Sequence, residues 1–178
     1  MGLFLISSVT ASASATVEFT TGIDSTYNEY QFHFVNMHPA SDAQAFQFQV
    51  NAVGQTGFNE TMTTTYFRAG HDEANSVTEL SYIASYDQAQ ATGYQNIGGY
   101  IGADADQSVS GVLTLYAPSS TTYIKHFVAR ASLSFATDMA KDNYAAGYIN
   151  TTAAIDEISF NFASGNIDAG SIHMYGVG

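Results

Sequence analysis

Three segments of the chain alternate strictly between apolar and polar side chains. Every second position in 29–34, 45–50 and 157–162 is apolar, and most of these positions are aromatic (Tyr30, Phe32, Phe34; Phe46, Phe48, Val50; Ile158, Phe160, Phe162). A period of two places successive side chains on opposite faces of a β-strand, so each segment predicts a strand with one buried and one solvated face. Such strands must cover their apolar faces, which favours the packing of one sheet on another.

Seven further segments combine β-branched and aromatic residues less regularly. They are Leu3–Thr10, Thr16–Thr21, Thr61–Phe67, Val109–Tyr116, Tyr123–Phe135, Gly147–Thr151 and Ser171–Val177. Clusters of Gly, Asn, Asp, Ser and Pro separate them, and these residues favour turns. About ten short strands predict an all-β fold, an antiparallel jelly-roll-like β-sandwich. We expect residues 1–178 to form a single domain of this kind.

Two stretches depart from the alternation and predict one or two short helical turns. Asp72–Gly93 can place four apolar side chains on one helical stripe (Val77, Leu80, Ile83 and Ala84), within what is otherwise a long loop. Thr137–Asn143 is the second candidate.

The end of the chain predicts a β-hairpin. Its first strand would bury Ile158, Phe160 and Phe162, and the turn would span Ser164–Gly170. The returning strand would then place Ile172 and Met174 against the same core.

Charged side chains are scarce and unbalanced. Sixteen Asp and Glu stand against four Lys and Arg, which gives a formal net charge of −12, and charged residues form 11% of the chain. Nucleic-acid binding requires clusters of basic residues, and an anionic membrane surface repels an acidic chain. We therefore expect neither nucleic acid nor a membrane as a partner. The 46% hydrophobic content is too high for a disordered acidic segment.

No motif points to an enzyme. The chain has no cysteine, no Gly-x-Ser-x-Gly nucleophile elbow and no dinucleotide-binding fingerprint. The densest polar cluster, His71-Asp72-Glu73, is more typical of a solvated loop than of a metal or catalytic site. Asp104–Ser108 resembles the start of a calcium loop, but Val109 and Leu115 stand where an EF-hand requires Gly and Glu. We expect no cofactor, no metal and no catalytic residues; a calcium site of another type in these loops stays open.

The few basic residues single out one predicted strand, which contains both Lys125 and Arg130. Their spacing places them on opposite faces unless a bulge intervenes. An isolated Arg in a strand often pairs with a carboxylate, within the fold or across a subunit interface. Lys125 and Arg130 are therefore candidate ion-pair or subunit contacts, with a free surface position as the remaining alternative.

A distinctive pattern closes the chain: Ser164-Gly-Asn-Ile167, followed by Gly170, Ile172, Tyr175 and Gly176. It resembles the signature Ser-Gly-Asn-Ile…Gly-x-Ile-x-x-Tyr-Gly of a family of small virion structural proteins from tailed bacteriophages, frequent in marine phages. Shorter blocks extend the resemblance over nearly the whole chain: Ile6-Ser-Ser8, Tyr27, Tyr30, Phe34, Asn36, Pro39-Ala40, Thr121–Phe127 and Ala146-Gly-Tyr148.

The resemblance implies a jelly-roll-like sandwich on the exterior of the virion and supplies no catalytic residue. Because 178 residues leave no room for the shaft and attachment domain of a full fibre, we expect a capsid decoration (cement) protein. Such a protein would stabilise the outer shell as a homotrimer bound to the major capsid protein or other virion proteins. The alternative is a tail or fibre-tip protein whose tyrosines and polar loops bind a host-surface glycan.

Overall fold

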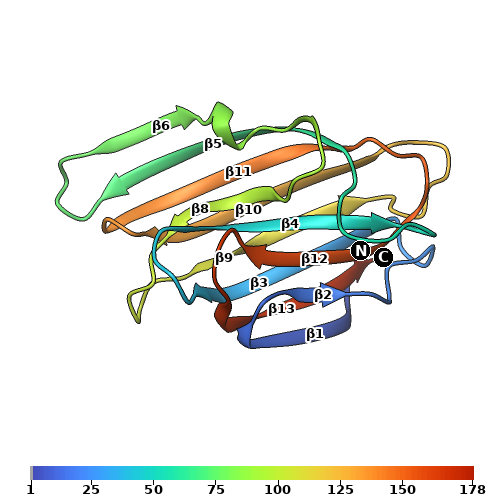
Figure 1. The fold of residues 1–178 in the computed structure, drawn as a ribbon, viewed down its shortest axis with the longest axis horizontal. Helices are drawn as coiled ribbons and strands as arrows, with labels where there is room; N and C mark the ends of the chain where they lie inside the picture. Colours follow the sequence, from blue (N-terminus) through green and yellow to red (C-terminus); the bar gives the residue numbers. More distant parts are fainter. Residues whose placement is uncertain (1) are drawn as a thin grey trace.

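The computed structural model describes residues 2–178, which form thirteen β-strands and one 3₁₀ turn (Figure 1). The elements are β1 (Leu3–Ser14), β2 (Val17–Phe19), β3 (Glu29–Pro39), β4 (Gln44–Ala52), β5 (Met62–Asp72), β6 (Thr78–Tyr82), η1 (Ala84–Tyr86), β7 (Ala89–Ala91), β8 (Gln95–Ile101), β9 (Val109–Tyr116), β10 (Lys125–Phe135), β11 (Met139–Ile149), β12 (Ile155–Phe162) and β13 (Ile167–Val177).

The strands form two antiparallel layers. The large sheet has the order β1-β13-β3-β9-β10-β11-β5, and both β6 and β7 pair with the far side of β5. The small sheet has the order β2-β12-β4-β8. A single residue pair, Phe135 with Ile101, joins β10 to β8 at one corner. The predicted all-β, antiparallel, jelly-roll-like sandwich is confirmed.

Aromatic side chains fill the space between the layers. Phe160 of the small sheet has its ring centroid 5.7 Å from that of Phe32 in the large sheet, and 5.9 and 6.5 Å from those of Phe46 and Phe48. Phe48 in turn meets Phe127 of β10 edge-to-face at 4.9 Å. All of these rings are buried. The alternating residues of the sequence therefore form the centre of the core, with the ring geometries that aromatic pairs prefer.

The C-terminal hairpin prediction is wrong, although both of its strands exist. β12 lies in the small sheet between β2 and β4, whereas β13 lies in the large sheet between β1 and β3. The short segment 163–166 thus connects the two layers. Ile172 and Met174 do reach the same core as Phe160. Periodicity determines which face of a strand is apolar, but it carries no information on which strands pair.

The predicted helical stripe in Asp72–Gly93 is wrong, but the stretch does contain one of the expected short helical turns. Most of this stretch forms β6 and β7, and only Ala84–Tyr86 is helical. Leu80, which was expected on the buried stripe, is 80% exposed. Asp72 ends β5 and accepts backbone hydrogen bonds from Ser76 and Val77, which closes the β5–β6 hairpin.

The second predicted helical turn, Thr137–Asn143, is a tight β-turn followed by a strand. Asp138 has a φ of 55°, the left-handed conformation that such turns use. From Met139 the chain pairs residue by residue with β10, and Lys141, Asn143 and Ala145 are buried in alternation. The period of two was present here, but polar and charged residues occupy two of the inward positions and hide it.

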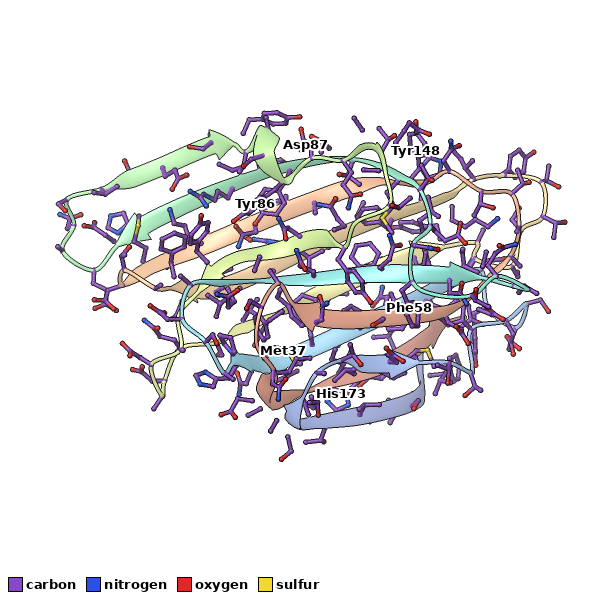
Figure 2. All side chains as sticks on the ribbon, viewed as in Figure 1. Met37, Phe58, Tyr86, Asp87, Tyr148 and His173 are labelled. Carbon is purple, nitrogen blue, oxygen red and sulfur yellow. The ribbon has the colours of Figure 1, made fainter. Side chains whose placement is uncertain are left out.

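One strand, β8, is absent from the segments that the sequence predicts, and it contains two glycines. Gly98 and Gly99 lie inside β8, and Gly99 is next to the side chain of Tyr86, which is labelled in Figure 2. A Cβ atom on Gly99 would lie 2.6 Å from Cε2 of Tyr86. Glycine at this position permits the close approach of η1 to the sheet, which is a packing role rather than a turn.

Candidate functional site: the outer face and free edge of the large sheet

The large sheet has one face packed on the small sheet and a second face, here called the outer face, that points away from the core. On β10 the side chains of His126, Val128, Arg130 and Ser132 point to the outer face and are exposed, in alternation with buried neighbours. This surface extends across the strands of the large sheet, from β5 to β1 (Figure 1).

A ridge of three stacked side chains crosses the middle of the outer face. Arg130, Tyr144 and Phe67 are directly opposite one another on β10, β11 and β5. The Tyr144 and Phe67 rings are parallel within 2° at a centroid distance of 4.7 Å, and the Arg130 guanidinium lies 5.1 Å from the Tyr144 centroid. Cation–π and ring-stacking contacts therefore cover both faces of Tyr144.

The position of Arg130 on this ridge is fixed by an ion pair within the chain. Its Nη2 donates to Asp142 Oδ2 at 2.7 Å and its Nε donates to Oδ1 at 3.1 Å, while the Tyr144 hydroxyl donates to the same carboxylate at 3.0 Å. The hydrogen bonds from Arg130 hold the pKa of Asp142 below its usual value. Of the alternatives for Arg130, the structure shows an intramolecular pair.

Two shallow depressions flank the ridge, and small side chains form their floors. One has a volume of about 660 Å³ and is floored by Ala69, Ser110, Ser132 and Ala140. The other, of about 440 Å³, lies over Thr63, Thr65, Val128 and Ala146 and is bordered by Tyr148, which is labelled at the upper right in Figure 2. A partner protein with a surface of complementary shape could pack against this ridge and its two depressions.

Lys125 lies on the opposite side of β10 and is fully buried. Its Nζ donates to the carbonyl oxygen of Thr151 at 3.2 Å, and among residues 2–178 it has no carboxylate at salt-bridge distance. Burial lowers the pKa of Lys125, against the opposing effect of the Glu60 charge. The structure thus places Lys125 in the interior of the protomer and Arg130 on its surface.

A second ionic cluster, the inner triad of Arg68, Glu79 and Lys141, was not expected from the sequence. Glu79 on β6 accepts a 2.8 Å bond from Nε of Arg68 and a short bond from Nζ of Lys141. Lys141 is almost completely buried and lies over the ring of Phe135. A signal was present, because Arg68 has the same strand parity as Met62 and Tyr66, which predicts an inward side chain.

Because of Glu79, the stability of the fold is expected to depend on pH in the acidic range. Burial alone would raise its pKa, but the bonds from Lys141 and Arg68 lower it from 4.5 to about 2. A depressed folded-state pKa stabilises the fold above about pH 4.5, and this contribution is lost as the pH falls towards 2. We predict that Glu79→Gln destabilises the protein by on the order of 3 kcal/mol near neutral pH.

Urea unfolding between pH 7 and pH 2 tests this prediction. The free energies of unfolding of the wild type and of Glu79→Gln should converge as the pH falls from 4.5 to 2. Asp142→Asn, which breaks the exposed ion pair, is the matched control and should cost less than about 1 kcal/mol. Parallel pH profiles for wild type and Glu79→Gln would show that the triad does not act in this way.

The histidines contribute hydrogen bonds on or near the outer face. His33 and His173 are opposite each other on β3 and β13, and the pKa of His33 is lowered by burial and by the neighbouring His173. Nε2 of His33 is hydrogen-bonded to Oε1 of Gln31 at 2.9 Å, and Nδ1 of His173 to the Ser8 hydroxyl at 2.8 Å. His71 is exposed at the end of β5.

The acidic loops come together at one end of the sandwich. Asp72, Glu73, Asp104, Asp106 and Asp138 border one open depression of about 800 Å³. Within residues 2–178, however, no three His, Asp or Glu side chains converge closely enough to hold a metal ion. Asp72 is already engaged with Ser76 and Val77 in the β5–β6 turn.

The free edge of the large sheet is β1, whose strand partner in the described chain is β13. This strand is twelve residues long and contains no charged side chain. Leu3, Phe4 and Leu5 at its start are 50%, 52% and 60% exposed. An exposed edge of this length and composition is a site where another strand can pair.

Comparisons of the chain with protein-family models, with curated proteins and with solved structures find no match. In the part of the chain that the structure describes, no helix is long and apolar enough to cross a membrane.

Proposed function

We propose that this chain is a non-enzymatic structural protein of a tailed-bacteriophage virion, a decoration protein that binds the outer surface of the capsid and stabilises it. The C-terminal resemblance, Ser164-Gly-Asn-Ile167 with Tyr175-Gly176, supports the class of protein. These residues lie in β13 and just before it, in the layer that carries the outer face.

The distribution of charge is the observation on which the proposal depends. The chain has a net charge of −12, yet β1 contains none of its sixteen acidic residues. An acidic exterior keeps a protein present in many copies soluble and repels packaged nucleic acid. Attachment is favoured at surfaces without charge, and the free edge and the depression over Thr63, Thr65, Val128 and Ala146 supply them.

Cementing of a shell follows from mass action. A protein that binds the assembled shell, but not its dissociated subunits, stabilises the shell by the free energy of binding. We propose a homotrimer bound at the junction of neighbouring capsid subunits, because one copy of such an assembly contacts several subunits at once.

Depletion of the protein tests the function. Virions made without it should assemble and package normally, but their shells should melt at lower temperature and release nucleic acid under osmotic shock. Adding purified protein back should restore the melting temperature in a concentration-dependent way. Unchanged shell stability together with lost adsorption to host cells would contradict the proposal and favour the alternative.

That alternative, a tail or fibre-tip protein that binds a host-surface glycan, is favoured by one feature. Three tyrosines far apart in the sequence, Tyr82, Tyr100 and Tyr123, are 62%, 49% and 73% exposed. Exposed rings offer faces for stacking against sugars. Binding of the purified protein to a glycan array, with and without a calcium chelator, distinguishes this function from cementing.

A further inference from the structure

The backbone of β1 presents hydrogen-bonding groups to solvent at known positions. Gly2 and Gly178 form two backbone hydrogen bonds, in each of which the N–H group of one donates to the C=O group of the other, so the N–H and C=O groups of Gly2 face β13. In an antiparallel pair successive residues alternate between the partner strand and the free side. Leu3 and Leu5 therefore direct their N–H and C=O groups away from the sheet.

The same alternation continues beyond a bulge between Leu5 and Ser7. On β13, every second residue counted from Gly178 directs its backbone hydrogen bonds toward β1, and Ile172 is one of these residues. Its partner Val9 therefore directs its own N–H and C=O groups toward β13. The peptide groups of Thr10, which follows Val9, are thus at the free side. β1 consequently has two arms with unpaired backbone groups, one before the bulge and one after it.

The other borders of the sheets are protected in the ways that natural proteins use. β2 has three residues, one of which is Glu18, and β7 also has three. β6 has five residues and holds the inward charge of Glu79. Short edges and inward charges discourage pairing with other strands. β8, at the remaining border, carries no charge, but most of its residues are buried and Ile101 pairs with Phe135 of β10. β1 differs from all of these, because it is long, uncharged and exposed.

We propose that β1 pairs with β1 of a second copy of this chain, antiparallel about a two-fold axis. Such a contact is self-complementary, because the same donors, acceptors and side chains face each other from both protomers. It would also cover Leu3 and Leu5, which are half exposed or more in the protomer.

Charge favours self-association at this edge over most of the surface. Two copies with a net charge of −12 each repel one another at most surfaces, whereas β1 brings no carboxylate to the contact. The contact goes beyond the proposed function and does not depend on it. On a shell it would link neighbouring trimers across two-fold axes into a continuous layer.

Sedimentation velocity of the purified full chain tests this contact. The wild type should sediment as an even multiple of the 19.0 kDa protomer. Leu5→Lys, which places a charge on the first arm, and Thr10→Pro, which removes a solvent-facing N–H from the second arm, should each be folded. At least one of them should halve the mass at equal concentration.

Leu80→Lys is the matched control, because Leu80 is an equally apolar and more exposed residue at the opposite border of the sheet. Its mass should equal that of the wild type, and thermal melting should show that all variants are folded. A monomeric or trimeric wild type, or an unchanged mass in both β1 variants, would overturn the proposal. Virion depletion tests the function separately, so the two failures are distinguishable.

Discussion

Removal of residues 171–178 is expected to abolish soluble folding. The deleted residues pair with β1 on one side and with β3 on the other, so the truncation removes the partners of Leu3–Thr10 in β1 and exposes one edge of β3. It also removes Ile172 and Met174 from the core, where both are fully buried. Each such side chain alone contributes about 2–5 kcal/mol, and typical domains are stable by only about 5–15 kcal/mol.

Solubility after expression and thermal melting by circular dichroism measure this effect. Ser171→Ala in the full chain is the control, because this side chain points to the outer face and makes no core contact. It should leave the protein soluble, with a single cooperative transition. A truncated chain that is soluble and melts cooperatively would contradict the placement of β13 between β1 and β3.

Phe160→Ala should be the most destabilising single substitution in the small sheet. Phe160 is fully buried and its ring contacts those of Phe32, Phe46 and Phe48. Removing a buried aromatic ring costs about 3–5 kcal/mol, because the transfer free energy is lost and a cavity remains. For a chain of this size the melting temperature should fall by about 6–20 °C.

Phe67→Ala is the same substitution at an aromatic stack on the outer face. Phe67 is 42% exposed and stacks on Tyr144, so its removal should cost about 0.5–1.5 kcal/mol. Chemical denaturation of both variants gives the two free energies. Equal effects would mean that the space between the sheets is not the main core of the protein.

The strands were largely predictable from the sequence, because the period of two is a local property. Val109–Tyr116 forms a strand with the predicted bounds, and the segments around Phe32, Phe48 and Phe160 are buried on the predicted faces. β8 was missed because it contains Gly98 and Gly99, of which Gly99 serves a packing contact with Tyr86. Glycine has the same local signature in a turn and in a tight contact.

The candidate site was less predictable, because it depends on register between distant strands. Arg130 meets Tyr144 only after β10 pairs with β11, and Tyr144 meets Phe67 only after β11 pairs with β5. The inner triad likewise joins residues from three strands. The scarcity of basic residues did point to Arg130 and Lys125. The two side chains lie on opposite faces of the sheet, however, so Arg130 is on the surface and Lys125 is in the interior.

The uncharged edge was visible in the sequence as a charge-free segment, but its meaning depends on topology. Leu3–Ser14 becomes a free edge because β13 returns to lie beside it. A strand of this composition inside a sheet would need no partner from another chain.

Electron cryomicroscopy of the intact virion tests the central claim most directly. We predict repeated density on the outer surface of the capsid shell that accommodates this two-layered sandwich, with β1 or the outer face in contact with neighbouring subunits. Density for the sandwich at the tail or fibre tip, or a shell whose outer surface holds no copy of it, would contradict the claim.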